Sequence, residues 1–177
     1  MAGFFSTLMV NQDLYNSWAE TLDWLFDDNR FPKEKGWEGP EVTKFTNRVK
    51  RLPGLKKENY IYEKSDLVTF PESHTFHVPL IMMISGSGQG RGIVTHIRNG
   101  IAHGRTRFFR ENGELYLEIE DFGKKSSGGG RQTAYLYIPI SYITQMHEIY
   151  SELEKARSND RSKIKASHGK KRKKKTG

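Results

Sequence analysis

Cysteine is absent from this chain of 177 residues, and several kinds of site are excluded with it. Without a thiol there is no disulfide framework, no cysteine-ligated zinc or iron–sulfur cluster and no cysteine nucleophile. Long hydrophobic runs are missing as well. The longest nearly unbroken apolar segment, Val78–Ile84, is far shorter than the ~18 residues needed to span a membrane, and residues 1–11 lack the pattern of an export signal. We therefore expect a cytoplasmic protein that does not contact a membrane.

Excess positive charge is confined to the C-terminal end of the chain. Residues 1–157 contain as many acidic as basic side chains, whereas residues 158–177 carry a net charge of +8. Because domains usually contain about 100–200 residues, we expect residues 1–157 to form a single domain. The basic composition of residues 158–177 predicts a disordered tail. Its run Lys170–Lys175 is typical either of a non-specific RNA anchor, which gains affinity from counterion release, or of a nuclear-localisation signal.

Hydrophobic spacing predicts several helices. Residues 12–28 carry an apolar stripe at helical spacing, which we expect to enter the core, and a second helix is predicted over residues 40–52, before a Pro-Gly stop. A C-terminal helix is predicted over residues 139–157. Between residues 55 and 85 the pattern fits a short strand or an irregular helix. Val78–Ile84 is predicted to be a buried helical segment, although its periodicity does not distinguish a helix from a strand.

Strand signals are concentrated after residue 105. Residues 107–110 and 114–121 alternate around Asn112-Gly113, the dipeptide favoured in tight hairpin turns, and a further strand is predicted over residues 133–138. This β element would follow a helix at residues 93–103. The fold expected from the sequence is therefore mainly α, a helical bundle with a small β insertion at about residues 106–138.

Residues suited to acid–base chemistry are concentrated in Ile97–Gly104, the run IRNGIAHG. Within it Arg98 is followed by Asn99 and, five positions after Arg98, by His103. Imidazole exchanges protons near neutral pH, guanidinium donates to phosphate oxygens, and Asn99 can orient either group. This set favours cleavage of a phosphodiester without a metal ion.

Helical geometry constrains how these side chains meet. At about 100° per residue, Arg98 and His103 lie roughly 140° apart on an ideal helix and do not share a face. To act together they would have to converge where the helix ends at Gly104, or across a symmetric dimer that brings two copies into one cleft. His96 shares a face with Asn99 and His103 and is a secondary candidate. The alternative is purely structural: His103 caps the helix and Arg98 is a solvated or ion-paired surface residue.

The run IRNGIAHG resembles the signature of the HEPN superfamily, small α-helical proteins whose motif is Arg, four to six residues and His. Asn commonly follows that Arg, as Asn99 does here, and a short extension or hairpin commonly follows the helix. The resemblance is specific over residues 97–104 and extends in outline over residues 78–121. It implies a HEPN-like helical bundle that dimerises through the motif helices. Arg98 and His103 match the two catalytic positions of the motif, and Asn99 matches its supporting polar position.

The resemblance also implies a mechanism and a biological setting. His103 would deprotonate the ribose 2′-OH or protonate the leaving 5′-oxygen, and Arg98 would stabilise the charge of the transition state, to give a 2′,3′-cyclic phosphate. No metal or cofactor is implied. HEPN proteins are often toxins or abortive-infection components of antiviral defence, so an antitoxin or activating partner is expected. Some are not catalytic, and the alternative function is an RNA-binding or complex-assembly module.

Basic side chains outside the motif are further expected contacts to RNA. They are His96, then Lys124, Lys125 and Arg131 of the loop at residues 123–132, then Lys170, Lys171, Arg172, Lys173, Lys174 and Lys175 of the tail. A metal site is not expected, because His74 and His77 lack further ligands nearby. The acidic residues of 114–120 alternate with apolar ones, which predicts a solvated strand face opposite a buried one.

Overall fold

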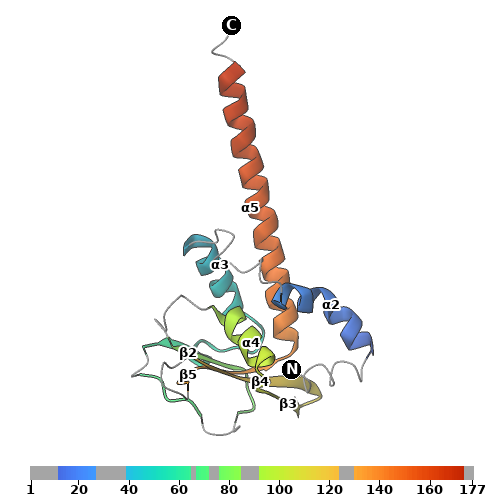
Figure 1. Ribbon diagram of the computed structural model, residues 1–177, viewed down its shortest axis with the longest axis vertical. Coiled ribbons are helices and arrows are strands. Elements are labelled where there is room, and N and C mark those ends of the chain that lie inside the picture. Colours follow the sequence, from blue (N-terminus) through green and yellow to red (C-terminus); the bar gives the residue numbers. More distant parts are fainter. Residues whose placement is uncertain are drawn as a thin grey trace.

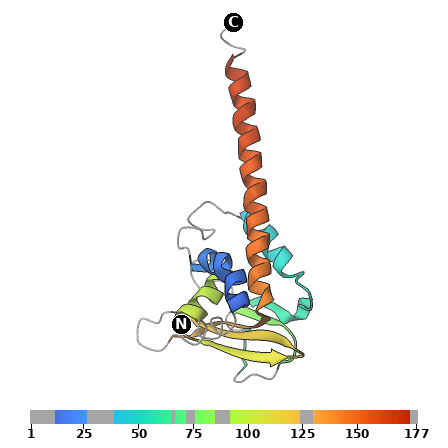
Figure 2. The same cartoon turned by 90° about the vertical axis from the view of Figure 1, so that its right-hand side faces the viewer.

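A five-stranded mixed sheet with helices on one side organises the computed structural model (Figures 1 and 2). The structure describes residues 12–26, 39–64, 67–71, 76–84, 92–123 and 130–173. In chain order the elements are α2 (Gln12–Phe26), α3 (Gly39–Val49), the 3₁₀ helix η1 (Lys57–Asn59), β1 (Tyr60–Glu63), β2 (Leu80–Ile84), α4 (Ile93–Ala102), β3 (Thr106–Glu111), β4 (Glu114–Phe122), β5 (Gln132–Pro139) and α5 (Ser141–Lys173).

The strands lie in the order β1-β2-β5-β4-β3, so β2 is inserted between β1 and a meander formed by the last three strands. The β1–β2 pair is parallel, whereas β2–β5, β5–β4 and β4–β3 are antiparallel. At the hairpin between β3 and β4, Asn112 and Gly113 have φ values of 50° and 84°. Positive φ at both central residues is what a type I′ turn requires, and the predicted hairpin is confirmed.

The expectation of a mainly α fold is wrong, because the protein is an α/β structure. The segment predicted as a buried helix, Val78–Ile84, contains strand β2, and Tyr60–Glu63 supplies a further strand beside it. Strands β3 to β5 do occupy the expected region of about 106–138, but they are three of five strands in one sheet rather than an insertion. Helices α2, α3 and α4 lie within three residues of their predicted bounds.

The main hydrophobic core lies between the sheet and the helices, which Figures 1 and 2 show on the same side of the sheet. Alternate residues of β2, β4 and β5 point into it, because successive side chains of a strand face opposite ways. Trp18, Leu22 and Leu25 of α2 are buried there, as their helical spacing predicted. The strand residues in this core are Ile81, Met83, Leu117, Ile119, Ala134, Leu136 and Ile138.

A second hydrophobic cluster covers the opposite face of the sheet. Its buried members are Leu80, Met82, Tyr116, Tyr135 and Tyr137, and side chains from the connection between β1 and β2 pack against them. The prediction of a solvated face on β4 is therefore wrong. Tyr116 and Glu118 lie on that face, and both are buried.

Helix α5 is much longer than predicted. The sequence favoured a helix ending near residue 157 and disorder after it, whereas α5 contains 33 residues and continues to Lys173. At about 1.5 Å per residue it is about 50 Å long, and its C-terminal half extends away from the sheet (Figures 1 and 2). In the described part of the chain, no helix combines the length and the hydrophobicity needed to cross a membrane.

Candidate active site

Helix α4 carries the IRNGIAHG run, and its C-terminal end is fixed by backbone hydrogen bonds. The N–H of Gly104 donates to Ile101 O at 3.1 Å, and the N–H of Arg105 donates to Gly100 O at 2.8 Å. Gly104 has a φ of 66°. This pairing is a Schellman motif, in which a glycine adopts the left-handed conformation that other residues disfavour. His103 is the C-cap residue, so the helix presents its imidazole at its very end.

Close packing on β4 holds α4 against the sheet. Gly100 meets Ile119 so closely that an added Cβ would lie 2.2 Å from Ile119 Cγ2 and 3.2 Å from the backbone oxygen of Glu120. Only a residue without a side chain fits at such a contact. The glycine therefore allows α4 to approach β4 more closely at this point than any other residue would.

The burial pattern of α4 separates a covered arc from a half-exposed one. Six residues of α4 are buried: Ile93, Val94, His96, Ile97, Gly100 and Ile101. At about 100° per residue they span roughly 160° of the helix surface. The rest of the surface has Arg98 at one margin, His103 at the other and Asn99 between them; Arg98 and Asn99 are half-buried and His103 is exposed. Although Arg98 and His103 do not share a narrow face, they border the same solvent-facing arc.

A buried polar network joins α4 to the end of β4. The Asp121 carboxylate accepts hydrogen bonds from His96 Nδ1 at 2.8 Å and from Asn99 Nδ2 at 3.2 Å, both at Oδ2, and from the N–H of Phe122 at 2.9 Å at Oδ1. The side chains of His96 and Asp121 are 0% and 1% exposed. A carboxylate is only an acceptor, so His96 carries its proton on Nδ1. In the described part of the chain, the other ring nitrogen, Nε2, has no hydrogen-bond partner.

An irregularity in the sheet places the Asp121 carboxylate. Asp121 is opposite Ala134 but Phe122 is opposite Gln132, so Thr133 is an extra residue in β5. Such bulges re-aim neighbouring side chains and are common beside active sites. The Thr133 hydroxyl donates to Asp121 O at 3.2 Å. Asn99 is thus held by Asp121, a residue whose side chain and backbone are both fixed by hydrogen bonds.

The structure separates the residues that the sequence grouped together. Arg98, Asn99 and His103 lie on the same helix surface, whereas His96 is fully buried and is removed from the expected RNA contacts. Arg131 is exposed at the start of β5. Four tail residues, Lys170, Lys171, Arg172 and Lys173, belong to helix α5. The remaining expected contacts, Lys124, Lys125, Lys174 and Lys175, lie outside the described residues.

Asp121 is the residue that sequence reasoning missed, although a signal for it was present. His96 and Asn99 are polar residues on or beside the apolar arc of α4, and Asp121 continues the buried alternation Leu117, Ile119 along β4. A polar group at a buried position requires a hydrogen-bonding partner. Polar residues on the apolar face of the helix and on the apolar face of the strand therefore indicated that His96 or Asn99 hydrogen-bonds to Asp121.

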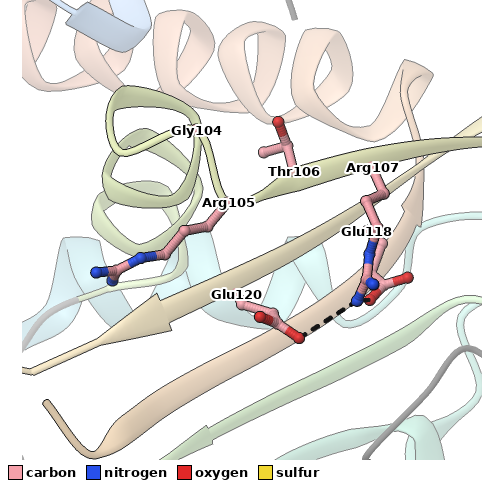
Figure 3. A pocket seen from close by; sticks show the side chains of 6 residues that line it. All are labelled: Gly104, Arg105, Thr106, Arg107, Glu118 and Glu120. Atoms are coloured by element: carbon pink, nitrogen blue, oxygen red, sulfur yellow. Dashed lines mark hydrogen bonds and ion pairs between the residues drawn. The ribbon is translucent and has the colours of Figure 1, made fainter. Parts of the chain in front are cut away.

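A cleft of about 210 Å³ is lined by residues that follow His103 in the chain, beginning with Gly104. Figure 3 shows the side chain of Arg107 turned toward two glutamates, with Arg105 extending away from them. Arg107 Nη2 donates to Glu118 Oε1 and lies 3.5 Å from Glu120 Oε1. The lining residues are Gly104, Arg105, Thr106, Arg107, Glu118 and Glu120.

The electrostatics of this cleft depend on Glu118, whose side chain is only 1% exposed. Its hydrogen bond to Arg107 is the main reason why the pKa of the guanidinium is raised. Burial, followed by the charge of Glu118, raises the pKa of the adjacent Tyr135, so its phenol stays neutral. The second oxygen of Glu118, Oε2, has no hydrogen-bond partner among the described residues.

The described residues contain no group of three or more His, Cys, Asp or Glu side chains placed to hold a metal ion. Arg105 stacks on the ring of Phe122, with the guanidinium carbon 4.7 Å from the ring centroid. The side chains of the site offer acid–base and electrostatic chemistry: an exposed imidazole, an oriented amide and several guanidinium groups. The chain matches no protein-family model, no curated protein and no solved structure.

Proposed function

We propose that the protein is a metal-independent endoribonuclease whose active site is the exposed arc at the C-terminal end of α4. The observation that carries the proposal is the placement of His103, Asn99 and Arg98 along one solvent-facing arc, with Asn99 held by the buried Asp121. Rigid support of this kind keeps catalytic groups near the geometry they need. The proposal rests on these residues and their resemblance to the HEPN motif, not on a helical bundle.

In the proposed reaction the ribose 2′-oxygen attacks phosphorus and the P–O5′ bond breaks. His103 accepts the proton of the 2′-OH, or donates one to the departing 5′-oxygen, and the products are a 2′,3′-cyclic phosphate and a 5′-OH. Arg98 donates to the phosphoryl oxygens as negative charge grows on them. Asn99, one turn before His103 on the same arc, orients the imidazole or the phosphate. DNA lacks the attacking 2′-OH and is not cleaved.

Two further elements belong to the proposal. The first is a homodimer through α4, in which the half-buried residues Thr95, Arg98 and Ala102 face a second copy and Arg98 approaches His103 of the partner subunit. The second is capture of RNA by Arg131 and by the basic residues 161–175. As a toxin or defence component acting in the cytoplasm, the protein would be controlled by an antitoxin or an activating partner.

Cleavage of end-labelled RNA in EDTA tests the proposal. His103→Ala and Arg98→Ala are compared with wild type and with two exposed control variants, His77→Ala and Arg51→Ala. We expect cyclic-phosphate ends, no cleavage of matched DNA, and a loss of about 10²–10⁴-fold for His103→Ala. The controls keep the wild-type rate. Light scattering on the same samples gives the oligomeric state.

Cleavage that persists at the wild-type rate in His103→Ala would overturn the proposed site. A wild-type protein that retards RNA on a gel without cleaving it would overturn the enzymatic proposal and support the alternative, a non-catalytic RNA-binding or complex-assembly module. A strict monomer that cleaves RNA would remove the dimer from the proposal.

A further inference from the structure

The cleft beside the end of α4 is lined by an equal number of cationic and anionic side chains. Arg105, just before β3, and Arg107 of β3 line it together with Glu118 and Glu120 of β4. The Arg105 guanidinium stacks on Phe122 and extends away from the two glutamates, so Arg107 is the cation beside them. Arg107, Glu118 and Glu120 bring charges of both signs together, so the cleft does not match a bare anion or a bare cation. Guanidinium groups only donate hydrogen bonds and carboxylates only accept them. The matching ligand is a neutral group that has both acceptors and donors.

The second observation is the buried and incompletely bonded carboxylate of Glu118. Its Oε1 is bound by Arg107, but its Oε2 has no hydrogen-bond partner within the described residues. A buried acceptor without a donor is unfavourable, so Glu118 depends on its bond to Arg107 and holds that guanidinium in place at the cleft. Glu120 is the more accessible carboxylate, since its side chain is 30% exposed. Arg107 is 60% exposed and contacts both glutamates through Nη2.

Among RNA bases, guanine has the complementary pattern. Its N1–H and N2–H₂ are adjacent donors that match the two oxygens of a carboxylate, and its O6 and N7 are the acceptors that arginine binds most often. The volume of the cleft, about 210 Å³, is below the ~300–1,000 Å³ of pockets that hold drug-sized ligands, so it suits one base rather than two. Its wall includes Gly104, which directly follows the exposed His103.

We propose that this cleft binds a guanine base of single-stranded RNA, next to the phosphate that His103 acts on. Glu120 accepts from the Watson–Crick edge of the base, and Arg107 donates to its O6 and N7. Glu118 anchors Arg107 through its Oε1. The base must be unpaired, because its Watson–Crick edge is in use. This inference rests on the proposed function for the position of the base along the strand, but the binding of guanine itself does not require catalysis.

The first arm of the test measures binding of the four nucleoside 5′-monophosphates to the full chain by calorimetry or NMR. Guanosine monophosphate is expected to bind about tenfold or more tightly than the other three, since one good bidentate contact to a base gives discrimination of that order. Glu120→Gln presents an amide donor to N1–H and N2–H₂ and loses this preference. Glu114→Gln, at the exposed far end of the same strand, keeps it. Equal binding of all four nucleotides by the wild type overturns the proposal.

The second arm maps cleavage sites on an unstructured RNA. Wild type is expected to cut beside guanosines, and Glu120→Gln to cut without that preference. Cleavage without base preference, or the same guanosine preference in Glu120→Gln, overturns the cleft proposal while the ribonuclease proposal stands. The opposite outcome is a protein that binds guanosine monophosphate selectively through Glu120 but never cleaves RNA. In that case the ribonuclease proposal fails, and the cleft remains a guanine site.

Discussion

Removal of the Asp121 carboxylate is the sharpest test of the buried network. In Asp121→Ala, His96 Nδ1 and Asn99 Nδ2 both lose their acceptor, and the side chain of His96 is 0% exposed. Both ring nitrogens of His96 would then be buried without partners, because Nε2 already has none among the described residues. Breaking a buried pair by removing one member costs about 3–5 kcal/mol.

This loss is large but does not unfold a typical domain, whose stability is about 5–15 kcal/mol. For a protein of this size it corresponds to a decrease in Tm of about 6–20 °C. Urea unfolding followed by tryptophan fluorescence measures it directly, since Trp18 and Trp24 are both buried in the core. Glu114→Ala, a change at an exposed position of the same strand, is expected to stay within about 0.5 kcal/mol of wild type.

A double-mutant cycle identifies the cause of the loss. Asp121→Ala leaves His96 without its acceptor, and His96→Ala removes one of the three donors to the Asp121 carboxylate. The double variant removes both groups together. The double variant is therefore expected to lose at least ~1 kcal/mol less than the sum of the two single variants. Additivity within about 0.5 kcal/mol, or a loss below about 1 kcal/mol for Asp121→Ala alone, would refute the reasoning.

Two further predictions concern α4 and the first strand. Gly100→Ala places a Cβ 2.2 Å from Ile119 Cγ2 and is expected to lower the free energy of unfolding by about 1–3 kcal/mol through overpacking. Gly92→Ala, with open space around its Cβ, is expected to change this free energy little. Equal urea midpoints for the two variants would show that α4 shifts freely on the sheet. Burial, with a smaller contribution from Tyr62, raises the pKa of Tyr60 to about 12, above the value of about 10 in an unfolded chain. The stability that neutral Tyr60 contributes is complete below pH ~10 and is lost as the pH rises from about 10 through 12. In a plot of urea midpoint against pH, Tyr60→Phe is expected to show a smaller decrease over this pH range. A plot identical to that of wild type would contradict the assignment.

The elements that sequence reasoning found depend on local signals. The Asn112-Gly113 turn requires positive φ at two adjacent residues, and few dipeptides other than Asn-Gly supply it cheaply, so the hairpin followed from the sequence. The stripe of α2 and the Gly104 stop of α4 are equally local. All three were correct within a few residues.

The elements that it missed depend on the surroundings of the strands. Polar and apolar residues do not alternate in Val78–Ile84 because both faces of β2 are buried. Ile81 and Met83 pack in the main core under the helices, and Leu80 and Met82 pack in the second cluster on the opposite face of the sheet. A continuous apolar run has the same appearance in a buried helix.

Glu118 shows the same limit for the candidate site. Its alternation along β4 was correctly recognised, but the prediction that this face is solvated failed because the β1–β2 connection covers the sheet there. No pattern within residues 114–122 reports a layer supplied by residues fifty positions earlier. The arc of Arg98, Asn99 and His103 came from a local motif, whereas Asp121 and the cleft required the pairing of α4, β3 and β4.

The insertion of β2 beside β5 has a consequence for how the chain folds. Strands β3, β4 and β5 are neighbours in both sequence and sheet, but β5 residues 134–137 pair on their other edge with residues 80–83. Contacts between distant segments form more slowly, because a longer loop must close first. Until β2 docks, β5 is an open edge that carries Tyr135, Leu136 and Tyr137, and such an edge pairs readily with other chains. Aggregation during refolding should therefore begin at the strand that the finished sheet protects best.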